Sequence, residues 1–222
     1  MNTKNYQKIV NQIPSNVKLV AVSKTQPLEN ILAIYNSGQR IFGENRPLDL
    51  RDRYEALPKD IDWHFIGHLQ TNKIKYIIPF VKLIHSIDSI KLLKNVNNSA
   101  QKHNRVVDVL LQFHIADETT KQGFQLTEIQ EFIKNDGLND LKNVNIVGVM
   151  GMATNTDDIN HVRTEFKNLK NIFNSLKEEF FSTKEDFKEI SMGMTNDYHI
   201  AIEEGSTIVR VGRAIFNDNI EI

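Results

Sequence analysis

The chain has 222 residues and a formal net charge of −1, so electrostatics favours neither nucleic acid nor an anionic membrane as a partner. It contains no cysteine, which excludes disulfides, thiolate metal ligands and cysteine nucleophiles and is compatible with a cytoplasmic location. The first residues lack the apolar segment of a signal peptide, and no apolar run approaches the ~20 residues that span a bilayer.

Short apolar segments alternate with amphipathic ones along the whole chain. An amphipathic segment at residues 2–12 comes first and predicts a helix. Eight segments then have the composition of strands, at residues 17–23, 40–45, 62–67, 82–88, 106–115, 144–152, 187–192 and 207–216. Most are continuously apolar, which is typical of parallel strands that are covered on both faces.

The segments between these strands predict helices. The clearest is 158–180, whose apolar residues follow a helical period. A capping box at 127–130 indicates the start of another helix, and Asp88-Ser89 and 195–197 are suitable caps for two more. Eight strands alternating with seven helices predict a single-domain (β/α)8 TIM barrel over residues 1–222, with an extra N-terminal helix. An open doubly wound sheet is the alternative, but the eight regular repeats and the absence of GxGxxG favour closure.

Two polar motifs follow the last two predicted strands, SMGMT at 191–195 and RVGR at 210–213. Barrel active sites lie at the carboxyl ends of the strands, and phosphate commonly binds after strands seven and eight. Either motif alone is typical of an ordinary strand-to-helix turn. The two in neighbouring positions indicate a phosphate site.

Each motif supplies groups that bind an anion. Ser191 and Thr195 carry hydroxyl donors, and Gly193 allows the backbone to approach a ligand closely. We expect Thr195 to begin a helix that runs to about residue 203, whose free N–H groups favour an anion. Gly212 and Arg213 offer backbone N–H groups from the other side.

Lys24 ends the first predicted strand, which adjoins the eighth in a closed barrel. Its amine then faces the phosphate site, and pyridoxal 5′-phosphate (PLP) carries both an aldehyde for a Schiff base and a phosphate. A Schiff base forms from a neutral amine, so we expect Lys24 to be partly shielded from water. The alternative is an ordinary solvated lysine at a strand end.

Arg210 lies in the eighth predicted strand and is a candidate contact of the pyridine nitrogen. Because arginine keeps its protons, it would leave that nitrogen unprotonated and the cofactor a weak electron sink. Racemisation, or no turnover, is then favoured over transamination and decarboxylation. Asn45 and His64 are further candidates for the pocket wall, although a buried core histidine is the simpler interpretation of His64. No metal site is predicted, since the histidines form no HExxH pattern.

At these residues the chain resembles the pyridoxal phosphate homeostasis protein family (the YggS/PROSC type) and, more distantly, the barrel domain of alanine racemase. The similar segments are AVSKT at 21–25, GEN at 43–45, WHFIGHLQ at 63–70, KQG at 121–123, SMGM at 191–194, DYHIAIEEGST at 197–207 and VRVGRAIF at 209–216. They span nearly the whole chain in order.

The resemblance implies a barrel of the alanine racemase N-terminal type in which Lys24 is the Schiff-base lysine and Arg210 the partner of the pyridine nitrogen. The phosphate-binding positions of the family match Ser191, Gly193, Thr195, Gly212 and Arg213. The family has no established turnover. The resemblance therefore implies a carrier or buffer of PLP that supplies PLP-dependent enzymes through transient contacts, with small amino acids as a further ligand class.

An amino-acid racemase is the alternative function. The resemblance to alanine racemase implies that the second base is a tyrosine from a separate β-domain of a partner subunit. Only six residues follow residue 216, so we expect a monomeric carrier. A barrel enzyme that binds phosphate but not PLP is a third possibility.

Two departures from the family pattern lie near the pocket. Arg46-Pro47 replaces the usual continuation after Asn45, and Gly151 stands where a larger side chain is common, which predicts a wider pocket near strand six. Pro47 suits a first helical position. The sequence leaves open whether Lys73 or Lys121 forms a second PLP site.

Overall fold

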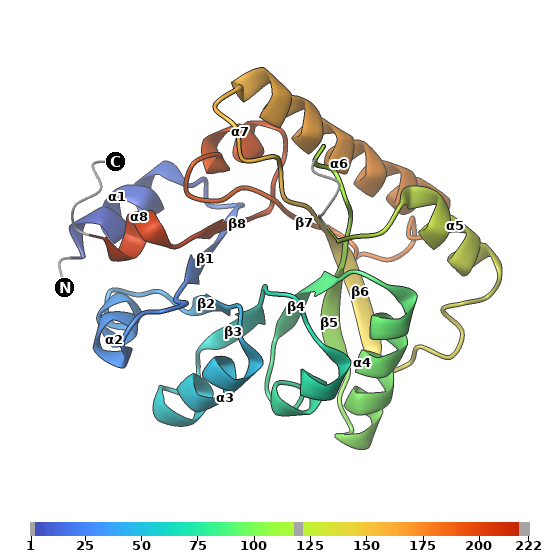
Figure 1. The fold of residues 1–222 in the computed structure, drawn as a ribbon, viewed down its shortest axis with the longest axis horizontal. Coiled ribbons are helices and arrows are strands. Elements are labelled where there is room, and N and C mark those ends of the chain that lie inside the picture. The colour runs from blue at the N-terminus through green and yellow to red at the C-terminus, as the bar shows by residue number, and fades with distance from the viewer. Residues whose placement is uncertain (1–2, 118–121, 218–222) are drawn as a thin grey trace.

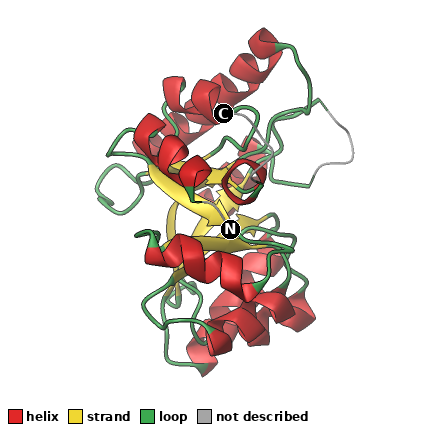
Figure 2. Cartoon of the chain, turned by 90° about the vertical axis from the view of Figure 1, so that its left-hand side faces the viewer, coloured by secondary structure: helices red, strands yellow, loops and turns green. Residues whose placement is uncertain are grey.

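The described part of the computed structural model comprises residues 3–117 and 122–217, and its strands form one closed barrel. The barrel runs β1 to β8 in chain order, and every neighbouring pair is parallel, including β8 with β1. Helices surround the strands, as Figures 1 and 2 show from two directions. The prediction of a (β/α)8 barrel with an extra N-terminal helix is confirmed, and the open sheet is excluded.

The eight strands are short and lie within the predicted segments. They are β1 (Lys18–Val22), β2 (Ile41–Glu44), β3 (Asp62–Phe65), β4 (Leu83–Ile87), β5 (Val107–Gln112), β6 (Val144–Met150), β7 (Glu189–Ser191) and β8 (Ile208–Val211).

The helices precede, connect and follow these strands. They are α1 (Lys4–Gln12), α2 (Leu28–Asn36), α3 (Pro47–Ala56), the 3-10 helix η1 (Thr71–Tyr76), α4 (Ile90–Lys102), α5 (Leu126–Lys134), α6 (Ile159–Glu179), α7 (Tyr198–Glu203) and α8 (Arg213–Phe216). None of these described helices is both long and apolar enough to cross a membrane.

Some predicted boundaries are confirmed. Ser89 caps α4, where its Oγ accepts a hydrogen bond of 3.3 Å from Leu92 N. Asp158 caps α6 by accepting from two backbone N–H groups of the first turn. Pro47 is the first residue of α3, where its missing N–H costs nothing.

Three predicted boundaries are wrong. The segment 207–216 is a strand only to Val211, because residues 213–216 form α8, and an apolar run does not distinguish a strand from a buried helical turn. Thr127 lies inside α5, which begins after Gln125 without a side-chain cap. Thr195 does not begin α7; it lies in the preceding loop, and the helix starts at Tyr198 after Asp197.

The core has two layers. Most buried apolar side chains lie between the strands and the helices. A smaller apolar cluster comprises Val20, Leu83, Leu110, Val147, Met150 and Ile208. Side chains alternate along a strand, so Arg210 is on the same face as Ile208, and His85 on the same face as Leu83. The side chains of His85 and Arg210 thus share the barrel interior with the small apolar cluster, and they lie on its side toward the carboxyl ends of the strands.

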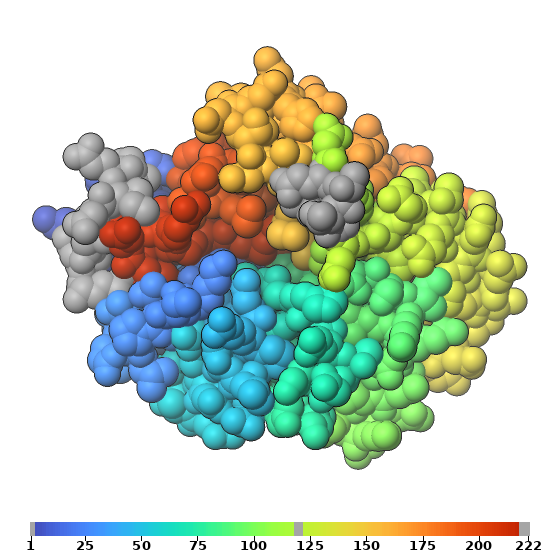
Figure 3. Space-filling view, in the orientation of Figure 1, coloured from blue at the N-terminus to red at the C-terminus, as the bar shows by residue number. Residues whose placement is uncertain are grey.

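Helix α1 packs beside the C-terminal segment of the described chain. Asn5 Nδ2 donates to the backbone O of Asn217 at 3.0 Å, and the Tyr198 hydroxyl donates to Gln12 Oε1 at 2.5 Å. Figure 1 shows α1 and α8 side by side, and in Figure 3 the red C-terminal part of the chain borders the lighter blue of the segment that follows β1. The two helices cover the barrel where β8 meets β1.

Candidate functional site

A cavity of about 340 Å³ opens at the carboxyl ends of the strands. Its walls come from the segments that follow β1, β2, β3, β6, β7 and β8, and the residues are Val22, Lys24, Asn45, Ile66, Met152, Ala153, Thr154, Asn155, Met194, Thr195, Asn196, Asp197, Arg210, Gly212 and Arg213. The volume suits a small organic ligand. Six of the nine residues predicted as ligand contacts line this cavity: Lys24, Asn45, Thr195, Arg210, Gly212 and Arg213.

Lys24 follows β1 in a turn that runs from Ser23 to Gln26. It lines the cavity, as predicted, but it is exposed rather than partly shielded. The turn projects beyond the last strand residue, Val22, so water reaches the amine from the open mouth of the barrel. The expectation of shielding is therefore wrong for this structure, whereas the position beside the loops after β7 and β8 agrees with the prediction.

The loops after β7 and β8 form one wall with anion-binding groups. Thr195 lines the cavity from the loop before α7, and Asp197 Oδ1 shapes that loop by accepting from Met194 N at 2.5 Å. Gly212 and Arg213 line it from the start of α8, where the first N–H groups have no partner inside the helix. This wall therefore combines a hydroxyl, a guanidinium and backbone donors.

Gly212 also makes the close approach of this wall to β1 possible. A Cβ at this position would lie 2.9 Å from the backbone O of Val22, which is closer than the Cβ atoms of real residues come to a neighbouring atom. Glycine is thus required where the β8–α8 turn passes over the end of β1. The turn that carries Lys24 and the start of α8 therefore border the same cavity.

Arg210 reaches the cavity from inside the barrel and is only 4% exposed. Its Nη1 donates to Ser191 Oγ at 2.5 Å, and its Nη2 donates to the backbone O of Gly151 at 3.2 Å. Burial lowers the pKa of Arg210 to about 10, against the opposing effect of Asp197, so the guanidinium stays charged at neutral pH. Both partners are uncharged acceptors, so the positive charge of Arg210 is not neutralised by them. The guanidinium is held in place at the cavity wall and keeps further N–H donors.

Ser191 and His64 are not among the residues that line the cavity, and their contact with a ligand stays a prediction. Ser191 Oγ is buried beneath Arg210 and lies 2.8 Å from His85 Nδ1, while His85 Nε2 lies 3.0 Å from His64 Nδ1. His64 instead borders a separate cavity at the amino ends of the strands. The four side chains form a buried chain of hydrogen bonds along the barrel interior.

Burial keeps both histidines of this chain uncharged. Desolvation, with smaller contributions from Lys18 and Lys82, lowers the pKa of His64 to about 3, and desolvation holds the pKa of His85 well below its usual range. Because Arg210 always donates, the Ser191 hydroxyl is free to donate to His85 Nδ1, and His85 Nε2–H to His64 Nδ1. In this arrangement Ser191, His85 and His64 hold the Arg210 guanidinium in place from inside the barrel. Sequence reasoning missed His85, although its place two residues after Leu83 marks it as an inward polar residue of β4.

Gly193 is also not among the lining residues of the cavity, and its contact with a ligand stays a prediction. Its φ of +94° lies in the left-handed region, and a Cβ would meet the Cβ of Ala201 at 2.6 Å. Its backbone O accepts from Arg210 N at 2.9 Å. The close approach that glycine permits here is to helix α7, which positions the loop containing Thr195.

The second departure, Gly151, does not widen the cavity as predicted. A Cβ there would lie 2.8 Å from Ile115 Cδ1 and 3.0 Å from Leu169 Cδ2, so apolar side chains already fill the space. Lys73 lies in η1, outside the cavity wall, and Lys121 lies outside the described residues.

Asn45 follows β2 and contributes an unsatisfied polar atom to the cavity wall. Among the described residues, its buried Oδ1 has no hydrogen-bond partner. Buried polar atoms are rarely left unpaired, and a ligand with a donor group would satisfy this one. The residues present therefore fit PLP: an amine for the aldehyde, cations and backbone donors for the phosphate, and an orphaned acceptor beside them.

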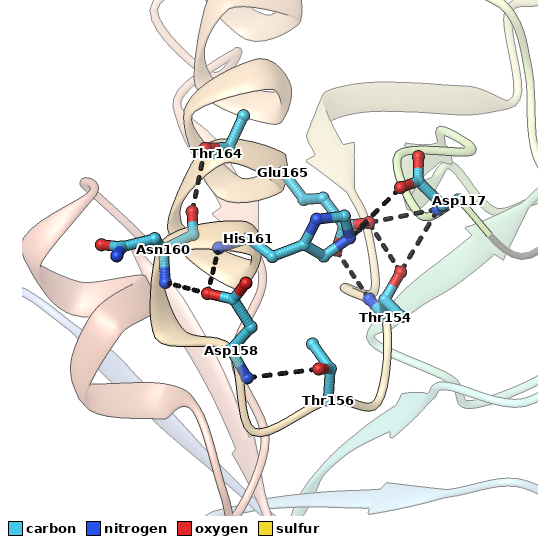
Figure 4. Close-up of polar contacts among 8 residues, drawn as sticks. All are labelled: Asp117, Thr154, Thr156, Asp158, Asn160, His161, Thr164 and Glu165. Atoms are coloured by element: carbon cyan, nitrogen blue, oxygen red, sulfur yellow. Dashed lines mark hydrogen bonds and ion pairs between the residues drawn. The ribbon is translucent and has the colours of Figure 1, made fainter.

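The opposite wall is held by Glu165, which sequence reasoning did not single out. Figure 4 shows its carboxylate between Asp117, Thr154 and His161. Its Oε1 accepts from Thr154 Oγ1 at 2.7 Å and from Asp117 N at 3.1 Å, and its Oε2 accepts from Thr154 N at 2.7 Å. Glu165 thereby fastens the loops after β5 and β6 to α6 and places Thr154 on the cavity wall. A glutamate beside Phe166 on the buried face of α6 was the available signal.

The ligand atoms of Asp117, His161 and Glu165 lie within 4.8 Å of one another, a separation that a metal site also shows. However, both oxygens of Glu165 already accept hydrogen bonds from the two loops, and His161 Nε2 lies 3.2 Å from Oε1 as an ion-pair partner. We therefore assign this cluster to loop anchoring.

Comparisons with known proteins agree with this architecture. The family described as alanine racemase, N-terminal domain matches residues 3–219. A protein of Aquifex aeolicus named pyridoxal phosphate homeostasis protein is 39% identical over 202 residues, which cover 90% of this chain and 86% of the relative. A Schizosaccharomyces pombe protein of the same name is 36% identical over 205 residues, covering 90% and 84%.

Solved structures give the same result. The chain is similar to PipY of Synechococcus elongatus without PLP, at 29% identity and a TM-score of 0.90 over 98% of this chain and 100% of that one. Against PipY with PLP bound, the identity is 29% and the TM-score 0.86 over 97% and 99%. An alanine racemase of Clostridium difficile, at 13% identity and a TM-score of 0.74, shares the fold over 98% of this chain but 55% of its own. The chain thus carries the alanine racemase N-terminal domain and belongs to the pyridoxal phosphate homeostasis protein family.

Proposed function

We propose that this protein binds PLP in the cavity at the carboxyl ends of the strands and serves PLP homeostasis as a carrier, with the cofactor attached to Lys24. One observation carries the proposal: the cavity joins an exposed lysine after β1 to anion-binding groups after β7 and β8. The family relatives named for PLP homeostasis, and PipY solved with PLP, support it.

Each lining residue has a role in this proposal. Thr195, Gly212 and Arg213 hold the phosphate through a hydroxyl, backbone N–H groups and a guanidinium. Arg210 directs a charged donor at the cavity, which suits an unprotonated ring nitrogen, and Asn45 accepts from a donor of the cofactor. Bound PLP would supply an aldehyde that joins Lys24 covalently. Ser191, His85 and His64 keep Arg210 in place.

The residues that line the cavity favour a carrier over a racemase. Two-base racemisation needs proton donors on opposite faces of the cofactor. Besides Lys24, the described lining residues include no tyrosine, histidine or cysteine, and their one carboxylate, Asp197, accepts a hydrogen bond from Met194 N within the loop after β7. Tyr198 donates its hydroxyl to Gln12 and packs against α1. A racemase would therefore have to use this loop-bound carboxylate as its second base, in place of the tyrosine that alanine racemase is expected to use.

The proposal includes three further statements that rest on the sequence. We expect the protein to lie in the cytoplasm, a location that the cysteine-free composition supports. We also expect it to be a monomer that makes transient contacts with PLP-dependent enzymes. Small amino acids are candidate second ligands, since an amine can displace Lys24 from the aldehyde. Analytical ultracentrifugation at several concentrations, with and without PLP, tests the monomer.

The direct test is a spectrum of the purified protein with PLP before and after borohydride. We expect a visible absorption band that borohydride removes, with the reduced cofactor found on Lys24 by mass spectrometry. Lys24→Ala should lose the band, whereas Lys59→Ala, an exposed lysine outside the cavity wall, should keep it. A colourless protein that borohydride does not label would contradict PLP binding and favour a phosphate-binding enzyme without PLP. Robust interconversion of L- and D-alanine would establish the racemase instead.

A further inference from the structure

Lys24 sits in a turn whose backbone conformation is unusual. Gln26 N donates to Ser23 O at 3.0 Å, so Ser23 to Gln26 form a β-turn with Lys24 and Thr25 at its centre. Thr25 has a φ of +65°, a conformation that glycine or asparagine normally supplies at the third position of such a turn. A β-branched residue there is strained, so contacts outside the turn have to maintain its shape.

Arg53 of α3 provides such contacts. Its Nη1 donates to Ser23 O and its Nη2 donates to Gln26 O, each at 2.9 Å. One planar guanidinium therefore binds the first and last carbonyl of the turn at the same time. Arg53 is only 8% exposed, so these bonds are shielded from competing water.

Glu44 completes the arrangement from β2. Its side chain is fully buried, and its Oε1 pairs with Arg53 Nη1 and accepts from Ser23 Oγ. A buried guanidinium needs such a partner, because an uncompensated charge is costly away from water. Glu44 directly precedes Asn45 on the cavity wall, so the pair links the turn of β1 to the end of β2.

We propose that Arg53 and Glu44 are positioning residues that hold the Lys24 turn in the shape from which its amine captures an aldehyde. This inference rests on the proposed function. In the capture step, Lys24 Nζ attacks the aldehyde carbon, a C=N bond replaces the C=O bond, and the oxygen leaves as water, without oxidation or reduction. The lysine side chain is flexible, so the fixed backbone limits where its amine is found, and small displacements of reacting groups cost large factors in rate.

The first test is Arg53→Lys, which keeps a charge beside Glu44 but replaces the planar fork of two nitrogens with a single nitrogen, so the two carbonyls are no longer held in the same geometry. Its matched control is Arg51→Lys on the same helix, where the arginine pairs with Asp52 at the surface. We compare the dissociation constants of PLP and of pyridoxamine 5′-phosphate, which has the phosphate and ring but no aldehyde. The comparison separates the bond between Lys24 and the aldehyde from the contacts with the phosphate and ring.

For Arg53→Lys we expect the affinity for PLP and the rate of borohydride-trapped labelling of Lys24 to fall about ten-fold or more. The affinity for pyridoxamine 5′-phosphate should change less than about three-fold, and Arg51→Lys should match the unmodified protein in all measurements. Equal losses for both compounds, or no loss for PLP, would overturn the positioning role. If the unmodified protein itself shows no adduct on Lys24, the proposed function fails instead.

A second pair of variants tests the turn without disturbing the buried ion pair. Thr25 is exposed, so the barrel tolerates changes there. Thr25→Pro cannot adopt a positive φ and should slow trapping of Lys24 about ten-fold, whereas Thr25→Gly retains that conformation and should trap at a rate within about three-fold of the original. Normal trapping by Thr25→Pro would sink the inference even if Arg53→Lys does not fold.

Discussion

Arg210 and Ser191 meet inside the barrel, where Nη1 of the arginine donates to Oγ of the serine at 2.5 Å and both side chains are buried. This contact fixes a charged guanidinium that has uncharged acceptors as its partners.

Replacing Ser191 with alanine removes that acceptor and leaves Arg210 with one fewer partner in a buried place. We expect the free energy of unfolding to fall by about 2–3 kcal/mol, the typical loss for a hydrogen bond to a charged group. Urea denaturation at pH 7 measures it. The control is Ser37→Ala, a partly buried serine that donates to Ala33 O, which should cost less than about 1 kcal/mol. Equal losses in the two variants would contradict the assigned role of Ser191.

The buried histidines predict a loss of stability in mild acid. Burial lowers the pKa of His64 to about 3 and holds the pKa of His85 well below 6.5. As the pH falls below about 6.5, these two histidines therefore become protonated in the unfolded chain but stay neutral in the folded chain. Between pH 6.5 and about 3 the unfolded state thus binds more protons, and stability falls as the pH falls. For His64 the loss at pH 5 is about 2 kcal/mol, and His85 adds to the loss in the same direction.

The measurement is a series of urea denaturations from pH 7 to pH 5, compared with His64→Gln. Glutamine can accept from His85 but does not titrate, so the dependence of the free energy of unfolding on pH should shrink by about one proton. Identical slopes in the two proteins would show that His64 does not resist protonation in the fold.

Gly193→Ala should disrupt the loop after β7, because a methyl group there would meet the Cβ of Ala201 at 2.6 Å and the φ of +94° is unfavourable for alanine. The matched control is Gly38→Ala, which has a φ of +106° but no atom within 4 Å of the added Cβ. We expect the control to lose about 1 kcal/mol of stability from backbone strain alone. Gly193→Ala should lose at least about 2 kcal/mol and weaken PLP binding as well.

Thermal denaturation and PLP titration of both variants check this prediction. If Gly193→Ala behaves as Gly38→Ala does, the approach of the loop to α7 is not needed to place Thr195.

Glu165→Gln should loosen the wall formed by the loops after β5 and β6. An amide offers one acceptor oxygen, whereas the carboxylate accepts from Thr154 N, Thr154 Oγ1 and Asp117 N. We expect a loss of about 2 kcal/mol in the free energy of unfolding and faster amide hydrogen exchange at Thr154. The control is Glu178→Gln on the exposed face of the same helix, and matching exchange rates in the two variants would refute loop anchoring.

The positions of Lys24 and Arg210 follow from the sequence because a closed parallel barrel makes its first and last strands neighbours. The register pairs Val20 with Arg210 and Ala21 with Val211, so both residues lie near the same strand ends. Continuous apolar segments and the spacing of the motifs were sufficient for that inference. The family resemblance supplied the expected roles.

The orientations of the site residues required the structure. Ser191 bonds to His85, which is 106 residues away, and Arg53 bonds to a carbonyl 30 residues away, so no local pattern identifies these contacts. The start of α7 at Tyr198 was also missed, because Thr195 and Asp197 are equally suitable caps by residue type. Local chemistry thus identified the polar groups, and long-range packing determined which of them reach the cavity.

Helix α1 depends on residues that are synthesised much later than the helix itself. Asn5 bonds to a residue 212 positions later in the chain, and Gln12 to one 186 positions later. On the ribosome, α1 leaves the exit tunnel long before these partners exist, so its hydrogen bonds to Asn217 and Tyr198 form only after those residues have been synthesised. A product truncated before residue 198 would lack both partners, and we expect its first helix to be undocked and open to proteolysis.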